Sequence, residues 1–249
     1  EPGSPAGRPV EPDVVARTKR SFTTRNVRLF DAPYDTRWSL EDGRPCPGDL
    51  LLATVTALGE QRELERPDGR KATLYEGDDI ILAYGDRYAP DGYEGVVPED
   101  LGPCDLLAKG GLAGRCLGHH GRLGPPTRLE PRGLLAADGE VVSLRQHAVF
   151  RPGTEPSVRP SHAIGVIGTS MNSGKTTALA ALVRGLSRAG LRVGAAKITG
   201  TGAGNDLWLY RDAGAEWTCD FTDAGYVSTY RVPVPELEGA ATSLVRGLT

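Results

Sequence analysis

The expected fold follows from the stretch Gly168-Thr169-Ser170-Met171-Asn172-Ser173-Gly174-Lys175-Thr176-Thr177. The apolar run 163–167 before it predicts a buried strand, and the run 178–186 after it predicts an amphipathic helix. A glycine-rich loop between a strand and a helix turns its backbone N–H groups toward the helix N-terminus, where the aligned peptide dipoles also attract phosphate. We therefore expect all ten residues of this loop to contact the phosphates of a nucleoside triphosphate.

Two side chains of the loop have distinct expected roles. Lys175 would reach the β- and γ-phosphate oxygens as a catalytic cation, and the Thr176 hydroxyl would ligate Mg²⁺. The alternative is a turn that binds nothing, and the independent strand and helix patterns on both sides argue against it. ATP is expected rather than GTP only as a general preference of the class of P-loop proteins described next; the N-K-x-D segment that is common in GTP recognition does not occur in the sequence.

The spacing within the loop carries a family resemblance. Five residues separate Gly168 from Gly174, one more than in the commonest form of the motif. The resulting G-T-x4-G-K-T loop resembles that of a class of P-loop NTPases including dethiobiotin synthetase, the cobyrinic acid and cobyric acid amidation enzymes, and the adaptor of molybdopterin-guanine dinucleotide synthesis. The resemblance covers residues 162–249 and is specific for a nucleotide-binding fold but not for a substrate. Thr169 stands where the ParA-like branch of the class has an extra lysine, which argues against that branch.

The resemblance implies further site residues. In this class the second strand often ends in a lysine, and the run 191–197 ends in Lys197. We expect Lys197 to be a second catalytic cation, with a solvated lysine at a strand end as the alternative. A P-loop sheet normally has five or more parallel strands, one of which ends in a carboxylate near Mg²⁺. No such run follows the third expected strand, 216–221, so either the sequence is incomplete, which we favour, or Asp220 or Asp223 ligates the metal.

The residues upstream predict a different kind of unit. Short apolar runs recur between turn signals at residues 49–58, 70–75, 79–84, 106–117 and 133–144. The Asp138-Gly139 step indicates a hairpin, and the spacing favours a small antiparallel barrel or sandwich. Residues 85–95 form a polar and aromatic loop with several glycines, which is either a recognition loop or a plain connection.

Together these patterns divide the chain into four expected segments. They are a disordered arm (1–20), a β-rich domain (21–150), a proline-rich linker (151–161) and a nucleotide-binding domain (162–249). The expected fold class is α/β, with an incomplete C-terminal P-loop NTPase domain built on a parallel sheet and a separate N-terminal antiparallel β domain. Within the C-terminal part, Asp206 is the expected N-cap of a helix that stops at Gly214.

Composition excludes several classes of function. The net charge of −3 does not suit a general nucleic-acid binder, and no apolar run is long enough to span a bilayer. The four cysteines are too few and too scattered for a disulfide scaffold, so a cytoplasmic location is expected. Buried thiols explain them better than zinc, because no close C-x2-C pair accompanies the possible ligands Cys46, Cys104, Cys116, His119 and His120.

We expect an enzyme that uses ATP and Mg²⁺ to phosphorylate a small-molecule acceptor. It would be a kinase, or a ligase that passes through an acyl or carbamoyl phosphate. The alternative is a nucleotide-dependent switch or adaptor that delivers a cofactor or metal to a partner, with the β unit as its partner-binding module. A third alternative, a barrel binding protein with a decayed nucleotide site, conflicts with the intact Lys175 and Thr176. Assembly into a homo-oligomer stays open.

Overall fold

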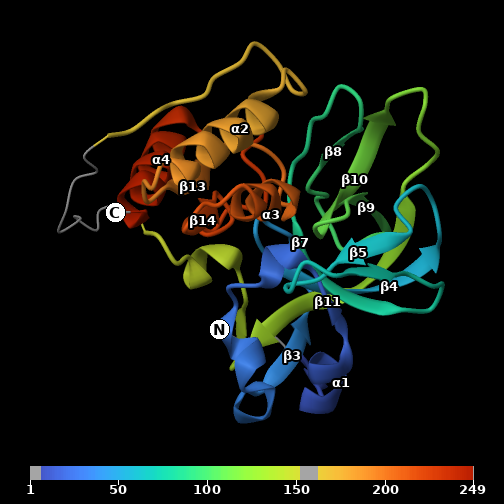
Figure 1. Ribbon diagram of the computed structural model, residues 1–249. Helices are drawn as coiled ribbons and strands as arrows, with labels where there is room; N and C mark the ends of the chain where they lie inside the picture. Colours follow the sequence, from blue (N-terminus) through green and yellow to red (C-terminus); the bar gives the residue numbers. More distant parts are fainter. Residues whose placement is uncertain (1–6, 152–161, 249) are drawn as a thin grey trace.

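The computed structural model describes residues 7–151 and 162–248 (Figure 1). In these residues the helices are α1 (Pro12–Arg17), α2 (Lys175–Arg188), α3 (Asn205–Asp212), α4 (Val234–Gly247) and the short 3-10 turns η1 (Phe22–Thr24), η2 (Arg28–Asp31), η3 (Pro33–Asp35) and η4 (Leu144–His147). The strands are β1 (Arg8–Val10), β2 (Lys19–Arg20), β3 (Trp38–Glu41), β4 (Leu50–Ala57), β5 (Glu63–Glu65), β6 (Lys71–Thr73), β7 (Asp79–Tyr84), β8 (Tyr93–Val96), β9 (Cys104–Ala108), β10 (Leu112–His119), β11 (Thr127–Ala137), β12 (Glu140–Val141), β13 (Gly194–Lys197) and β14 (Trp217–Asp220).

A ten-stranded mixed sheet dominates the molecule. Its main path runs β1-β3-β11-β4-β7-β10-β8, with β2, β9 and β12 attached at the sides. Because β9 pairs with both β10 and β11, the strands β4, β7, β10, β9 and β11 form a closed ring of hydrogen-bonded pairs. Most pairs are antiparallel, but β7 pairs in parallel with β10 and with β2. The ring is the barrel on the right of Figure 1.

The continuous apolar runs of β4 and β7 are explained by burial on both faces. Successive side chains of a strand point to opposite faces. Leu51 and Leu82 belong to one core cluster, whose members come from all five ring strands, and their neighbours Leu52 and Ile81 belong to a second. The second cluster lies outside the ring and includes Trp38 and other residues of the N-terminal segment. Both faces of these strands are therefore shielded from solvent, so apolar and polar residues do not alternate along their sequences.

The C-terminal residues form a small three-layer unit. Strands β13 and β14 pair in parallel, with Lys197 in register with Asp220. Ala195 packs with residues of α2 and α3, whereas Ala196 packs against the cluster of α4, so the helices cover opposite faces of the two strands. Gly214 adopts φ 105° directly after the C-cap of α3, which confirms the expected helix end. The expected N-cap was wrong: the cap position is Gly204, and Asp206 lies inside the first turn.

The expected fold class is contradicted by this architecture. The described chain is mostly one large mixed sheet, and its C-terminal part has a two-stranded sheet rather than a clear P-loop parallel-sheet domain. The β part is not a separate antiparallel domain either, because it contains parallel pairs and packs closely on the C-terminal unit. Val227, for example, is buried in the outer cluster of the barrel. Parallel pairing depends on distant segments, so short-range patterns could not reveal it.

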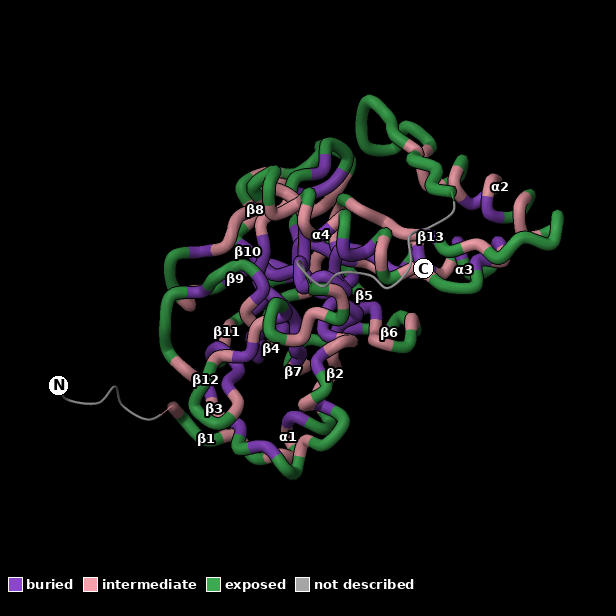
Figure 2. The backbone as a smooth tube through the Cα atoms, turned by 90° about the vertical axis from the view of Figure 1, so that its left-hand side faces the viewer, coloured by how far each residue is buried: buried purple, intermediate pink, exposed green. Residues whose placement is uncertain are grey.

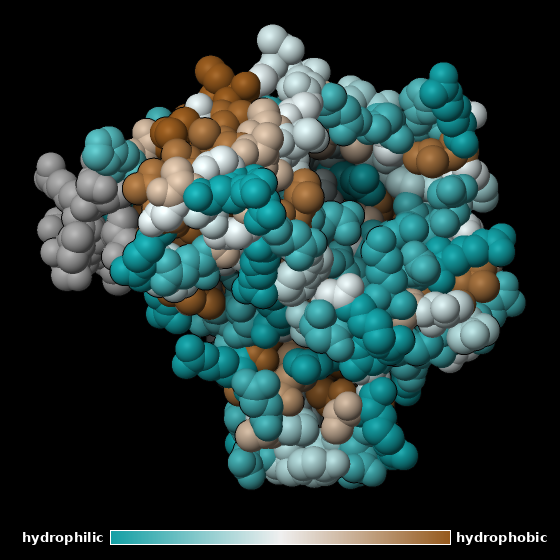
Figure 3. Space-filling model, in the orientation of Figure 1, coloured by the Kyte–Doolittle hydropathy of each residue, from teal (hydrophilic) through white to brown (hydrophobic). Residues whose placement is uncertain are grey.

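The strand predicted at 163–167 is the clearest local error. These residues have no strand assignment, and the Ile164 and Ile167 side chains are 62% and 94% exposed. Figure 2 shows the segment and much of α2 as exposed, and Figure 3 shows apolar side chains gathered on this face. A parallel strand needs ladder hydrogen bonds and cover on both faces, and the structure provides neither here. Apolar character alone does not determine pairing.

The predicted disordered arm is wrong for the residues that the structure describes, and the predicted linker lies almost wholly outside them. Residues 8–20, assigned to a disordered arm, contain β1, α1 and β2, because Arg8, Pro9 and Val10 pair with β3 and Lys19 pairs with β7. Residues 152–161 of the expected linker, and residues 1–6 of the arm, lie outside the described residues.

Candidate functional site

The glycine-rich loop 168–174 curls around the side chain of Lys175, which directly follows it. Gly174 precedes the 14-residue helix α2 with φ 85°, and Asn172 adopts φ 57°, a conformation that asparagine tolerates better than most residues. A Cβ atom added to Gly168 would lie 2.2 Å from Ser173 Oγ and 3.0 Å from Lys175 Cγ. Gly168 is therefore required for the loop to close.

Lys175 is held over the loop by the chain itself. Its ammonium donates hydrogen bonds to the Ser170 carbonyl and, at 3.3 Å, to the Ser173 hydroxyl. Both acceptors belong to the loop, so the charge lies inside the curve of the backbone. The loop also contacts the barrel, because the Asn172 amide donates to the carboxylate of Asp91. Asp91 belongs to the segment 85–95, which was predicted as a loop and of which residues 93–95 are part of β8. Through Asp91 this segment contacts the glycine-rich loop.

A row of polar side chains joins the first turn of α2 to the end of β13. Asp206 and Tyr210 lie one helical turn apart on α3 and share a face. The pKa of Tyr210 is raised, first by burial and then by the charge of Asp206, while a hydrogen bond with Thr176 opposes the rise. Asp206 in turn forms an ion pair with Lys197. The direct contact in this group is the ion pair of Asp206 with Lys197, and Thr176 and Asp206 both influence Tyr210 electrostatically.

Lys197 is not a solvated lysine at a strand end. Its side chain and that of Asp206 are each 20% exposed, and its ammonium lies 5.9 Å from the ring centre of Phe221. A Cβ atom on Gly200, which has φ 142°, would approach Lys197 Cε to 2.8 Å. The turn after β13 therefore closes over this side chain and fixes its position.

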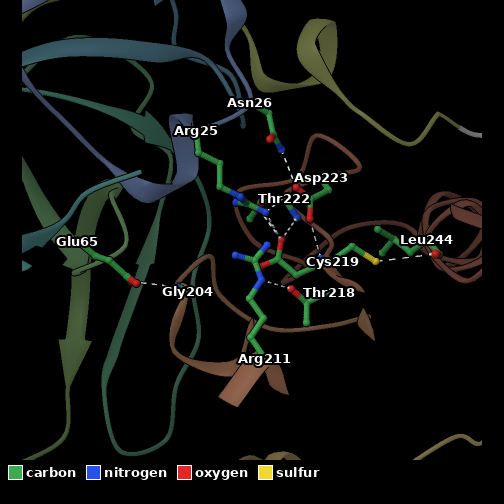
Figure 4. Close-up of polar contacts among 11 residues, drawn as sticks. Arg25, Asn26, Glu65, Gly204, Arg211, Thr218, Cys219, Thr222, Asp223 and Leu244 are labelled. Atoms are coloured by element: carbon green, nitrogen blue, oxygen red, sulfur yellow. Dashed lines mark hydrogen bonds and ion pairs between the residues drawn. The ribbon is translucent and has the colours of Figure 1, made fainter. Parts of the chain in front are cut away.

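Asp220 and Asp223, the expected alternative metal ligands, both form ion pairs with Arg25 of the N-terminal segment. Figure 4 shows Arg25 directed toward Asp223. Arg25 Nη2 lies 3.2 Å from Asp220 Oδ1 and 2.6 Å from Asp223 Oδ1. The Asn26 amide donates to the same Asp223 oxygen at 2.7 Å. The Thr222 backbone N–H donates to Asp220 Oδ1 at 2.8 Å, while Asp220 Oδ2 is buried with no hydrogen-bond partner among the described residues. Arg25 therefore supplies the positive charge beside these carboxylates and competes with a metal ion for them, and Asp220 Oδ2 is the one carboxylate oxygen of the pair that has no partner among the described residues.

A second polar contact ties the barrel to the C-terminal unit. Glu65 of β5 is 2% exposed, and it accepts 3.0 Å hydrogen bonds from the Gly204 backbone N–H and the Trp208 indole. Trp208 also packs edge-on against Phe22 at 6.2 Å. Glu65 thereby positions the start of α3, which carries Asp206.

Sequence reasoning missed three residues of this region. Asp206 was assigned only a capping role, and Tyr210 and Arg25 had none. Spacing could have identified the first two, because residues four apart on a helix near the phosphate loop share one face. Arg25 had no local signal, since it acts almost 200 positions away along the chain.

The possible zinc ligands are not brought together. Within residues 7–151 and 162–248, no group of three or more His, Cys, Asp or Glu side chains could hold a metal ion. Cys104 and Cys219 are buried, Cys46 is exposed, and all four cysteines are free thiols. The helices in the same residues include none with the length and apolar character to cross a membrane.

Comparisons of the chain with protein-family models, with curated proteins and with solved structures found no match. The functional assignment must therefore rest on the chemistry of the loop and its neighbours.

Proposed function

We propose that the chain binds ATP with Mg²⁺ and transfers a phosphoryl group to a small-molecule acceptor. The observation that carries the proposal is the closed loop 168–174, with Lys175 inside its curve and a 14-residue helix beginning at that lysine. A helix N-terminus preceded by a glycine-rich loop favours phosphate through both its N–H groups and its dipole.

The residues around the loop fit both the phosphates of ATP and the Mg²⁺ ion. Gly168 and Gly174 leave the space that a closed loop needs, because a Cβ on Gly168 would overlap Ser173 and Gly174 has φ 85°. The Thr176 hydroxyl is the expected Mg²⁺ ligand from the loop, and Thr176 and Asp206 both act on Tyr210 of α3. We assign no metal role to Asp220 or Asp223, which Arg25 occupies.

Phosphoryl transfer moves negative charge onto the transferring oxygens, and Mg²⁺ supplies part of the neutralising charge. Lys175 would hold the β- and γ-phosphate oxygens from the loop. Lys197, with its position fixed by Asp206 and the turn at Gly200, would supply a second cation whose contribution grows as the transition state forms. Fixed cations of this kind need no reorganisation during the reaction.

Calorimetry with MgATP tests the binding part of the proposal. Lys175→Ala should weaken ATP binding at least tenfold, about 1.4 kcal/mol, because it removes a charge from the phosphates. Arg188→Ala, in the last turn of the same helix, is the matched control and should bind ATP normally. Equal affinities for the wild type and the Lys175 variant would exclude the loop as the nucleotide site.

One observation favours the switch as a second candidate. The phosphate loop contacts the barrel through Asn172 and Asp91, so a nucleotide that moves the loop would also change the barrel loop 85–95. Lys197→Ala separates the two functions in single-turnover ATP cleavage. An enzyme should lose roughly 10²-fold in rate with little change in affinity, whereas a switch should lose affinity with little change in rate.

A further inference from the structure

A cavity of about 140 Å³ lies between the barrel and the segment that follows β14. Gly48 and Gly85 contribute from the barrel side, and Gly225 from the other. A Cβ on Gly85 would lie 2.4 Å from Val227 Cγ1, so the absence of a side chain at position 85 lets Val227 pack directly against the barrel backbone. A cavity of roughly 150 Å³ in a protein accommodates benzene, so this one suits a small organic molecule.

One of the two cations in the cavity lining, Arg231, is only weakly paired and can bind an anion. Its lining contains two guanidinium groups, Arg145 and Arg231, and one carboxylate, Asp86. Arg145 is already paired, at 2.8 Å with Glu236, and it stacks over Tyr226. Arg231 is only loosely paired, because its nearest Asp86 oxygen is 4.0 Å away and its side chain is 55% exposed. A planar guanidinium with open donors matches a carboxylate in a two-bond arrangement.

Arg231, which lines this cavity, also has an unusual backbone conformation. Three non-glycine residues in the described ranges have a positive φ: Asp138, Asn172 and Arg231. Asp138 lies in a tight turn and Asn172 in the phosphate loop, and both are residue types that tolerate this conformation. Arg231, at φ 62°, is of a type that rarely adopts it. Backbone strain of this kind persists only where the surrounding structure imposes it, and it is concentrated at active sites and ligand-binding sites.

The cavity adjoins the elements that flank the phosphate loop. Tyr230 at its rim stacks on Tyr88 at 5.8 Å, and Tyr88 lies in the barrel loop whose Asp91 contacts Asn172. On the other side, Ser228 bridges to Thr201 in the turn that follows Lys197. Both connections lead to residues that we assign to phosphoryl transfer.

We infer that this cavity binds the acceptor through a carboxylate, which Arg231 holds, and that the acceptor is a small carboxylic acid. The acceptor role rests on the proposed function, whereas carboxylate binding does not. The aromatic rings of Tyr226 and Tyr230 pack beside the two arginines and would border the carbon chain of such a ligand. Asp86 lies beside Arg231, with its nearest oxygen 4.0 Å from the guanidinium, and would accept a hydrogen bond from a hydroxyl or amino group of the ligand.

Calorimetry with acetate, succinate and glutamate tests the ligand class. At least one should bind with a dissociation constant below roughly 10 mM, while succinamide, a neutral analogue of succinate, should not bind. Inorganic phosphate is the third kind of probe. Phosphate binding as tight as that of the best carboxylate would overturn the assignment, and so would the absence of any carboxylate binding.

Three variants locate the site. Arg231→Ala should weaken carboxylate binding at least tenfold, and Arg231→Gly should do the same while accommodating the positive φ, which controls for folding. Arg192→Ala is the matched control, because Arg192 is also paired with a carboxylate, Glu216, and stacked over a ring, Trp217. Binding that is unchanged in both Arg231 variants would refute the inference.

MgATP titrations with the same proteins separate the two proposals. If ATP binds normally and no carboxylate does, the inference fails and the proposed function stands. If a carboxylate binds through Arg231 but ATP does not bind, the acceptor role is overturned together with the proposed function. If both bind, the carboxylate should raise the rate of ATP cleavage in the wild type at least tenfold and in Arg231→Gly far less.

Discussion

Removal of Arg25 should weaken the packing of the C-terminal unit on the barrel and lower the stability of the protein. Arg25 is the cation of a buried network in which its own side chain is 14% exposed and those of Asp220 and Asp223 are 0% and 11% exposed. Removing one partner of a buried ion pair typically costs about 3–5 kcal/mol, because the other charge is left uncompensated. Asn26 and the backbone N–H groups continue to stabilise the carboxylates, so we expect about 3 kcal/mol for Arg25→Ala. In a chain of this size that lowers Tm by roughly 6–12 °C.

The same variant should make stability depend more strongly on pH. Burial raises the pKa of Asp223, and Arg25 opposes the rise. Without Arg25 the pKa rises further, so the native state holds a proton that the unfolded state releases over a wider pH range. Stability falls with rising pH wherever the native state binds more protons. The loss caused by Arg25→Ala should therefore be larger at pH 7 than at pH 5, measured by urea denaturation.

Two controls make this test decisive. Arg37→Ala removes an exposed pair with Asp138, in which the side chains are 88% and 58% exposed, and should cost no more than about 0.5 kcal/mol. Adding Asp223→Asn to Arg25→Ala should recover part of the loss at pH 7, because one uncompensated charge is gone. A loss below about 1 kcal/mol, or an equal loss at both pH values, would refute the reasoning.

Three further predictions follow from burial and exposure. Glu65→Ala should destabilise by about 2–3 kcal/mol in urea, because the Gly204 N–H and the Trp208 indole lose a buried acceptor, and Glu65→Gln should cost less. Ile167→Asp should change the unfolding free energy by no more than about 0.5 kcal/mol, whereas Val183→Asp in α2 should be severely destabilising; a large effect at Ile167 would instead support a buried strand. Burial raises the pKa of Cys104 to about 12, so a thiol reagent at pH 8 should modify the exposed Cys46 quickly and Cys104 only after unfolding; because Cys116 is half-buried, the test uses Cys46→Ser with Cys116→Ser, and fast labelling that persists in this double variant would contradict the prediction.

The sequence allowed good prediction of elements whose causes are local. The runs 49–58, 70–75 and 79–84 contain β4, β6 and β7, and the helix predicted at 178–186 lies inside α2. Asp138 and Gly139 both have a positive φ between β11 and β12, as a two-residue hairpin requires. In each case the pattern and the structure depend on residues a few positions apart.

Prediction from the sequence failed for structural features that depend on contacts between residues far apart along the chain. The parallel pair of β7 with β10 joins residues about 30 positions apart, and the Arg25 network joins residues almost 200 apart. No short-range pattern records such contacts, so the sequence appeared to contain two separable domains. The run 163–167 failed for the opposite reason, because its local pattern suits a strand but its surroundings provide no partner.

The candidate site depends on both local and distant interactions, so only part of it could be predicted. The loop and Lys175 could be predicted, since one short motif specifies both. The partners of the loop could not, because Asp91 comes from the barrel and Asp206 and Tyr210 from α3. Lys197 shows the consequence most clearly: its position at the end of β13 was predicted, but its pairing with Asp206 was not. Asp206 neutralises part of the charge of Lys197 through their ion pair. If Lys197 acts on a phosphoryl group, this pairing must weaken or be shared during the reaction, so Asp206→Asn should alter turnover even though Asp206 is absent from the motif.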